Sequence, residues 1–343
     1  MNKLRRRLCL ALAGLCASPV LMAAPRRKKR IYIITYRGKT DVEKGFRDYF
    51  AERGIAIEYI ERDLNQNIEL VPMLLTEIRS LKPDLVFTWG TTVTQAFAGK
   101  YDEVDPARHI ADIPVVFAIV AAPIASRLTP SLASSGRNLT GVYHVAPTLA
   151  QLRAIQAYRE FKRLGVLYTP TESNSRVIIA ELKTLGTSMG IDIVDHPFKL
   201  DASGKPVIRD VPEILQAIKK AGAEWLYLPP DSFLGTHAQQ LVIPAAHALG
   251  LPTFAATEQI MDAGALAGLV SRYYSIGQFT AYKAAQILFD GLSPERIPIE
   301  TLTRYSFLIR MSVAKQLNLL PPLSMFNSAE FVVERDTNDR REN

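Results

Sequence analysis

Polar and aromatic side chains that directly follow short apolar segments are the residues of this sequence that could do chemistry. Hydroxyl and amide groups supply hydrogen bonds, carboxylates and a guanidinium supply charge, and aromatic rings supply a flat apolar surface. Such groups are suited to holding a small molecule without covalent chemistry. The candidate ligand contacts are Tyr36, Trp89, Thr91, Thr92, Ser173, Asn174, Ser175, Asp231, Glu258 and Arg272.

The hydroxyl, amide and aspartate candidates have a structural alternative, because each precedes a segment with helical periodicity. The run 173–175 could cap the helix that follows it, and the exposed amides of the same helix end favour an anionic ligand group. Thr91 and Thr92 stand at the start of another such segment, and Asp231 could cap a helix that begins at residue 232. Capping and ligand contact both remain open for these residues.

The charged and aromatic candidates leave similar alternatives open. Glu258 is either a surface acid beside a helix cap or an acceptor in a cleft. Arg272 fits an ion pair between domains, or a planar fork that grips a carboxylate or phosphate. Tyr36 and Trp89 could stack on a planar ligand or pack in the core. Arg37, in the first loop, could meet an anion but is more typical of solvated surface charge.

Catalytic and metal-binding patterns are not evident. The segment Gly38-Lys39-Thr40 follows a predicted strand, but the earlier glycine that a phosphate loop requires would fall at Ile33. The five histidines show no HExxH or other close ligand spacing, and no serine stands in an evident nucleophile turn with a paired histidine. We therefore expect no enzymatic activity, no metal site and no cofactor.

The first 23 residues have the pattern of a cleavable secretory signal peptide. Four basic residues precede an apolar run over 8–20, which is too short to span a bilayer at about 20 residues. Cleavage fits best after Ala23. The two cysteines, Cys9 and Cys16, lie in this segment and do not follow the small residues of a lipoprotein box. We expect a free periplasmic protein without thiols.

Charge and length limit the class of protein. The full chain has a net charge of +7. Four basic residues before residue 8 and five over 26–30 together contribute +9, so residues 31–343 carry about −2. This near-neutral body offers no basic surface for nucleic acid, and the run 26–30 is expected to be a solvated leader. A mature chain of about 320 residues favours two domains.

Apolar periodicity alternates between strand and helix, which predicts α/β units with parallel sheets. The first set comprises strands 31–36, 55–60, 85–88, 115–120 and 139–143 and helices 41–53, 68–81 and 91–98. The second set comprises helices 148–161, 173–189, 211–220 and 232–249 and strands 164–168, 191–194, 225–228 and 253–255. The remaining strands 266–271 and 301–309 and helices 276–289 and 312–317 are too few for a third domain. Because ligands bind beyond the carboxyl ends of parallel strands, the polar loops there predict one shared cleft.

The sequence resembles the ABC-transporter substrate-binding proteins of the type I periplasmic fold, in the group that includes tryptophan- and tyrosine-binding members. The resemblance spans residues 31–319 and rests on the order and spacing of short motifs. These motifs are Lys82-Pro-Asp-Leu-Val-Phe87, Asp112-Ile-Pro-Val-Val-Phe117, Gly136-Arg-Asn-Leu-Thr-Gly-Val142, Gly165-Val-Leu-Tyr168 with Ser173-Asn-Ser175, Leu228-Pro-Pro-Asp231, Asp262-Ala-Gly-Ala-Leu266 and Tyr273-Tyr274 before Gly277.

The resemblance implies two doubly wound, Rossmann-like lobes that close on a ligand like a Venus flytrap, with three interlobe crossings. The expected lobes are 30–144 with 272–300 and 145–271 with 301–330, followed by a flexible tail over 331–343. Amino-acid-binding members carry acids where this chain has Ala122 and Arg272. The departure favours a carboxylate, a phosphate or a neutral polar ring over an amino-acid zwitterion.

Two functions remain. The chain either delivers a small polar, anionic or aromatic ligand to the membrane permease of an ABC importer, or presents the ligand to a membrane sensor kinase or cyclase without transport. In both cases the expected protein is a monomer with a small-molecule ligand and no nucleic-acid partner.

Overall fold

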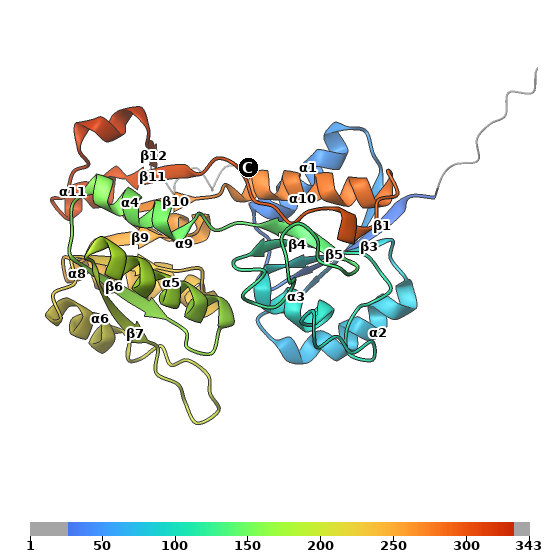
Figure 1. Ribbon diagram of the computed structural model, residues 1–343, viewed down its shortest axis with the longest axis horizontal. Helices are drawn as coiled ribbons and strands as arrows, with labels where there is room; N and C mark the ends of the chain where they lie inside the picture. Colours follow the sequence, from blue (N-terminus) through green and yellow to red (C-terminus); the bar gives the residue numbers. More distant parts are fainter. Residues whose placement is uncertain (1–26, 333–343) are drawn as a thin grey trace, which may run out of the picture.

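The computed structural model describes residues 27–332, so the predicted signal peptide, both cysteines and the tail beyond residue 332 lie outside the described part. Two α/β units stand side by side, each built on its own sheet (Figure 1). We call them the first-sheet unit and the second-sheet unit. None of the helices within 27–332 is long and apolar enough to cross a membrane.

The first sheet contains five parallel strands in the order β2-β1-β3-β4-β5. Alternate residues of β1 point to opposite faces, as strand geometry requires. Ile31 and Ile33 join the core formed with α1 and α10, whereas Tyr32 and Ile34 join the core formed with α2 and α3. The strands are β1 (Lys29–Thr35), β2 (Ile57–Asp63), β3 (Leu85–Trp89), β4 (Val115–Val120) and β5 (Leu139–Tyr143), and the helices are α1 (Asp41–Glu52), η1 (Ile68–Leu70), α2 (Val71–Leu81), α3 (Gly90–Ala98), α10 (Tyr273–Leu288) and η3 (Pro294–Arg296).

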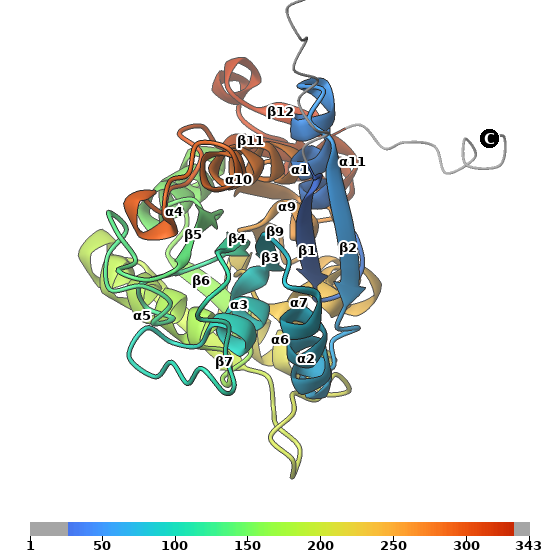
Figure 2. The same ribbon diagram turned by 90° about the vertical axis from the view of Figure 1, so that its right-hand side faces the viewer.

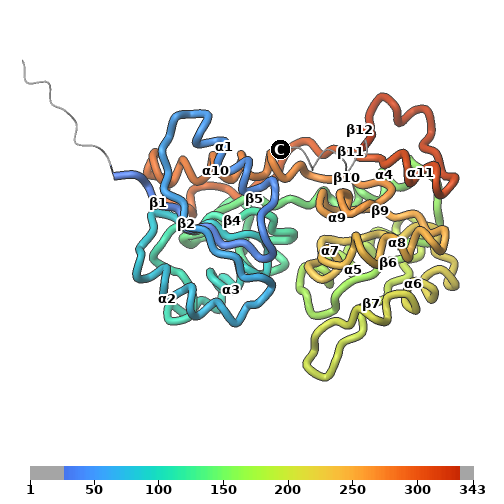
Figure 3. Tube along the Cα trace, turned by 180° about the vertical axis from the view of Figure 1, so that it is seen from behind, coloured from blue at the N-terminus to red at the C-terminus, as the bar shows by residue number. Residues whose placement is uncertain are grey.

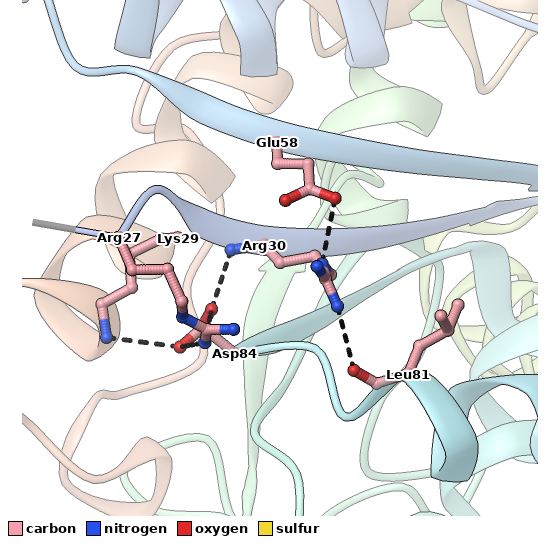
Figure 4. Close-up of polar contacts among 6 residues, drawn as sticks. All are labelled: Arg27, Lys29, Arg30, Glu58, Leu81 and Asp84. Carbon is pink, nitrogen blue, oxygen red and sulfur yellow. Dashed lines mark hydrogen bonds and ion pairs between the residues drawn. The ribbon is translucent and has the colours of Figure 1, made fainter.

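The expected solvated run over 26–30 is only partly so: Arg27 and Lys28 are exposed, whereas Lys29 and Arg30 are partly buried and belong to β1, which begins at Lys29 instead of residue 31. Asp84 accepts hydrogen bonds from Arg27 Nη2 at 2.9 Å and from the Arg30 amide at 2.8 Å (Figure 4). Arg30 also donates to Glu58 at 3.1 Å and to the Leu81 carbonyl at 3.1 Å. These partners hold Arg27 and Arg30 at the amino end of β1, between β2 and β3.

The second sheet contains seven strands in the order β12-β11-β10-β9-β8-β6-β7. Pairing is parallel except between β10 and β11, which are antiparallel because the chain leaves the sheet after β10 and returns from the first-sheet unit. The strands are β6 (Arg163–Tyr168), β7 (Asp192–Pro197), β8 (Trp225–Leu228), β9 (Thr253–Ala255), β10 (Ala267–Val270), β11 (Ser306–Arg310) and β12 (Glu330–Val332).

Helices cover both faces of the second sheet. One core is formed with α4, α5, α11 and η4, and the other with α6, α7, η2, α8 and α9. Their bounds are α4 (Thr148–Tyr158), α5 (Ser173–Met189), α6 (Val211–Lys220), α7 (Ser232–His237), η2 (Ala238–Val242), α8 (Ile243–Ala248), α9 (Glu258–Asp262), α11 (Met311–Gln316) and η4 (Leu323–Asn327).

The single helix predicted over 232–249 is wrong in one respect, because the structure divides it into α7, the π-helical turn η2 and α8. Pro244, the second residue of α8, cannot donate a backbone hydrogen bond, and a π-helical turn is one way to accommodate such a break. The short α9 and β12 were not predicted. The helices over 173–189 and 211–220 are confirmed residue for residue.

The chain passes between the two units three times (Figure 3). It leaves the first sheet after β5, returns after β10 to form α10, and leaves again after residue 300, where Glu300 forms a parallel bridge with Val142 of β5. Helix α10 therefore lies beside α1 on the first sheet, as both ribbon views show (Figures 1 and 2). This arrangement confirms the predicted fold class with three crossings.

Candidate functional site

A cavity lies where the carboxyl ends of both sheets face each other. Its volume is about 50 Å³. The first-sheet unit contributes the loop after β1 and the ends of β3, β4 and β5, and the second-sheet unit contributes the segments after β6, β8 and β9. The polar and aromatic residues of the lining are Arg37, Trp89, Thr91, Thr92, His144, Asn174, Asp231, Ser232, Thr257, Gln259 and Tyr273.

The amino end of α3 forms one wall. Its cap residue is Trp89, which supplies no side-chain hydrogen bond to the helix amides, and Gly90 has φ +83°. A left-handed backbone at this turn favours glycine. Thr91 Oγ1 accepts a hydrogen bond from the Ala121 amide at 3.3 Å, which ties the helix to the end of β4. The uncapped helix end is suited to a negatively charged or carbonyl group.

The end of β4 is irregular. Ile119 has φ +58°, an uncommon conformation for a β-branched side chain, and the register between β4 and β5 shifts between Phe117 and Val120. The shift brings the Val120 carbonyl to the backbone amide and to the ring Nδ1 of His144, each at 3.2 Å. Strain of this kind persists where the surrounding structure enforces it.

His144 is a neutral acceptor in the cavity wall. Its side chain is buried, and burial lowers the pKa of the imidazole to about 4. Because the Val120 carbonyl can only accept, the ring proton resides on Nδ1, and Nε2 keeps its lone pair. The ring also meets Tyr273 edge-on, with 6.1 Å between centroids.

Asp231 organises the second-sheet side of the cavity. Its carboxylate accepts hydrogen bonds from the Thr169 amide at 2.6 Å, the Thr169 hydroxyl at 2.9 Å and the Ser175 hydroxyl at 2.8 Å. It also accepts from the Leu234 amide at 2.8 Å and so caps α7. The predicted capping role of Asp231 is confirmed. Four donors occupy the carboxylate, which fixes the position of three separate segments.

Glu172 is a second acid at this wall. It accepts from the Ser232 amide at 3.0 Å and from Asn174 Nδ2 at 3.4 Å, while Asn174 also donates to the Pro230 carbonyl at 2.7 Å. Burial and the charge of Asp231 raise the pKa of Glu172 to about 7. No motif identified Glu172, because it belongs to a loop that was noted only for its small polar residues.

Arg37 connects the two units across the cavity. Its Nη1 donates to the Ser232 carbonyl at 2.6 Å and to Thr236 Oγ1 at 3.1 Å, and its Nη2 donates to Gln259 Oε1. The guanidinium lies 5.6 Å from the ring centroid of Trp89. Burial lowers the pKa of Arg37. The solvated role expected for Arg37 is therefore wrong.

The structure brings five of the ten predicted contacts to the cavity: Trp89, Thr91, Thr92, Asn174 and Asp231. The remaining five do not line it. Ser173, Asn174 and Ser175 lie inside α5, whose cap residue is Glu172 and which has no side-chain cap, so the capping role predicted for 173–175 is wrong. Ser175 bonds to Asp231, and Tyr36 is partly buried against the first-sheet cores.

Arg272 and Glu258 pair with each other at 3.2 Å at the start of α10. Glu258 also accepts from the Tyr273 amide at 2.5 Å, and burial raises the pKa of its carboxyl. The Arg272 side chain remains 46% exposed, and its second ionic neighbour is Glu330 at 4.0 Å. These contacts match the ion-pair alternative for Arg272; its role as an anion grip stays a prediction.

Two catalytic arrangements, a hydrolase nucleophile elbow and a cluster of metal ligands, are not formed in the described part of the chain. The segment Gly186-Thr-Ser-Met-Gly190 matches the spacing of a hydrolase elbow, but Ser188 lies in the last turn of α5 and donates to the Leu185 carbonyl at 2.7 Å. A nucleophile elbow requires a strand-to-helix turn instead. Within 27–332 no group of three or more His, Cys, Asp or Glu side chains could hold a metal ion.

Comparison with known proteins agrees with this geometry. The sequence model described as ABC transporter substrate binding protein matches residues 31–333. A tyrosine-binding protein of Clostridioides difficile is 23% identical over 282 residues, which cover 81% of this chain and 74% of the relative.

Two crystal structures share the fold. A conserved domain protein from Vibrio cholerae has a TM-score of 0.77 at 23% identity, covering 89% of this chain and 99% of its own. An ABC domain from Streptococcus pneumonia in complex with L-Trp has a TM-score of 0.76 at 20% identity, and the match covers 89% of this chain and 100% of that domain's chain. The fold is that of the type I periplasmic binding proteins.

Proposed function

Because the chain belongs to the family of ABC transporter substrate binding proteins, we propose that it captures a small polar ligand, anionic or aromatic, between its two units and delivers it to the membrane permease of an ABC importer. The observation that supports this proposal is the cavity lined by both units at the carboxyl ends of their strands. Relatives described as binding tyrosine and L-Trp make these two amino acids the first ligands to test.

The proposed lobes are 30–144 with 272–300 and 145–271 with 301–330, and they close by rotation about the three crossings. The packing of α10 on α1 supports the assignment of 272–300 to the first lobe. The proposed ligand contacts are Trp89, Thr91, Thr92 and Asn174, while Asp231 and Ser175 position the wall.

The family acts outside the cytoplasm, and we propose that residues 1–23 of this chain are a signal peptide removed on export to the periplasm. The mature protein is proposed to be a monomer that carries out no catalysis. Sedimentation or light scattering of the mature protein tests whether it is a monomer.

Calorimetric titration and thermal unfolding of the mature protein test the ligand. L-Tryptophan, L-tyrosine and small aromatic or aliphatic carboxylates form the panel, and a ligand at 100 times its Kd should add about 2.7 kcal/mol of stability. Thr92→Val should weaken binding about tenfold by removing one cavity hydrogen bond. Thr184→Val, on the exposed side of α5, is the matched control and should leave the Kd unchanged.

A panel without a stabilising ligand, or equal affinities in the two threonine variants, would overturn the proposal. Transport is tested separately by uptake of a radiolabelled ligand in cells that lack the gene. Unchanged uptake together with loss of a ligand response would favour the sensor alternative.

A further inference from the structure

Two hollows meet between the units, and Arg37 stands between them. The inner chamber is the cavity described above. The outer chamber is a neighbouring hollow lined by Thr40, Asp41, Gln66, Gln239 and Glu258 among others. Both chambers share Arg37, Gly235, Gln259 and Tyr273 in their walls.

The shared wall depends on the position of one guanidinium. Arg37 reaches the second-sheet unit through the Ser232 carbonyl, Thr236 Oγ1 and Gln259 Oε1, three acceptors on or beside α7 and α9. Gln259 in turn donates to the Gly235 carbonyl at 3.3 Å. The Arg37 guanidinium is thus held in a fixed orientation, because a guanidinium with several hydrogen-bond partners loses its rotational freedom.

Gly235 makes room for this arrangement. A Cβ atom at position 235 would lie 3.0 Å from Arg37 Nη2 and 3.4 Å from Gln259 Oε1. An alanine there would press against the guanidinium, so the absence of a side chain lets Arg37 approach α7 closely. From the first-sheet unit, the Trp89 ring faces the guanidinium at 5.6 Å.

We propose that Arg37 is a specificity-determining residue that separates the inner chamber from the outer chamber and thereby sets the size of ligand that the inner chamber accepts. A ligand confined to the inner chamber has the guanidinium as one wall. A ligand that extends into the outer chamber must displace Arg37 from Ser232 and Gln259. The inference rests on the proposed function, because it concerns the ligand of the same cavity.

Cysteine labelling tests the partition without a known ligand. With Cys9 and Cys16 replaced by serine, Ala121→Cys places a thiol in the inner chamber and Ala263→Cys places one in the outer chamber. The probes are methyl and benzyl methanethiosulfonate, which share one chemistry and differ in size. The measured quantity is the benzyl-to-methyl rate ratio at each thiol.

Arg37→Ala should raise this ratio about tenfold at position 121, in keeping with the loss of a charge-assisted hydrogen bond, and leave it unchanged at position 263. Gly235→Ala should act in the same direction by displacing the guanidinium. Thr236→Ala removes one hydrogen-bond acceptor of Arg37 but leaves the guanidinium in place. This variant should change the benzyl-to-methyl rate ratio less than twofold.

An unchanged ratio at position 121 in Arg37→Ala would overturn the inference. An equal rise of both rates would do the same, because it would show that the units open as a whole. Neither result depends on the ligand panel, whereas a failed panel with the expected labelling would overturn only the proposed function.

Discussion

The contact between α1 and α10 offers the sharpest test of how the chain is divided between its units. Two glycines let the helices approach until their backbones touch. A Cβ atom at Gly277 would lie 2.0 Å from the Val42 carbonyl oxygen and 2.8 Å from the Phe46 nitrogen. A Cβ at Gly45 would lie 2.1 Å from the Tyr274 carbonyl oxygen. We therefore predict that Gly277→Ala pushes α10 away from the first sheet.

The cost follows from these distances. Ordinary contacts of a Cβ atom begin at 3.4 Å, so the helices must separate by about 1.4 Å. The clashing atoms belong to the backbone and cannot rotate aside. Overpacking usually costs about 1–3 kcal/mol, and a clash with backbone belongs at the upper end, so we expect a loss of about 3 kcal/mol.

The two tryptophans allow the loss to be located. Trp89 belongs to the first-sheet unit and Trp225 to the second. In a Trp225→Phe background, urea unfolding followed by fluorescence reports the first-sheet unit, and in a Trp89→Phe background it reports the second. Gly277→Ala should lower the midpoint only in the first background. Ser275→Ala on the same helix is the control and should change stability by less than about 0.5 kcal/mol.

An unmoved Trp89 transition would refute the close packing of α10 on α1. A shift of similar size in both backgrounds would contradict the assignment of 272–300 to the first lobe as a separately unfolding unit.

Two further variants test buried charges. Lys283, whose side chain is 1% exposed, donates to the Pro298 carbonyl and to Glu300, each at 2.6 Å. Lys283→Ala should cost about 2 kcal/mol in urea unfolding, below the usual range for a buried pair because Glu300 is half-exposed. Lys44→Ala breaks an exposed pair and should cost clearly less, and equal losses in the two variants would contradict the argument. The raised pKa of Glu172 means that the folded state holds this proton more tightly than the unfolded state, so the free energy of unfolding should fall as pH rises from about 4.5 to 7, and Glu172→Gln should flatten that fall. Parallel pH curves for the two proteins would show that Glu172 is not desolvated.

The architecture was largely predictable because it follows from local periodicity. Strand β4 is a continuous apolar run, and helices such as α5 and α6 repeat apolar residues three and four apart, so the bounds of these elements were predicted without error. The antiparallel pairing of β10 with β11 could not be predicted from periodicity, since it depends on where the chain re-enters the second sheet.

The cavity was predictable as a place but only partly as a set of residues. Strand ends converge by topology, so Trp89, Thr91, Thr92, Asn174 and Asp231 follow from their position after a strand. The place of Arg37 could not be predicted in this way, because its partners lie 195 to 222 residues away in sequence and only the approach of the two units brings them together. A long side chain in a loop has no periodicity that reveals its direction.

His144 shows a different limit. Its sequence position marks it only as the first residue after β5, and its role depends on the irregularity at Ile119 that brings the Val120 carbonyl within reach. Among the non-glycine residues with positive φ in the described part, Ile119 is the β-branched one, and it lies in the cavity wall.

Two departures from local rules lie at or beside this cavity. Ile119, a β-branched residue in the cavity wall, adopts a left-handed backbone, and Glu172, which bonds to the wall residues Asn174 and Ser232, is a desolvated acid. Each of these features costs stability on its own, and neither improves the packing of either sheet. Because such costs are retained where function requires them, their presence together supports the proposed site without reference to any relative.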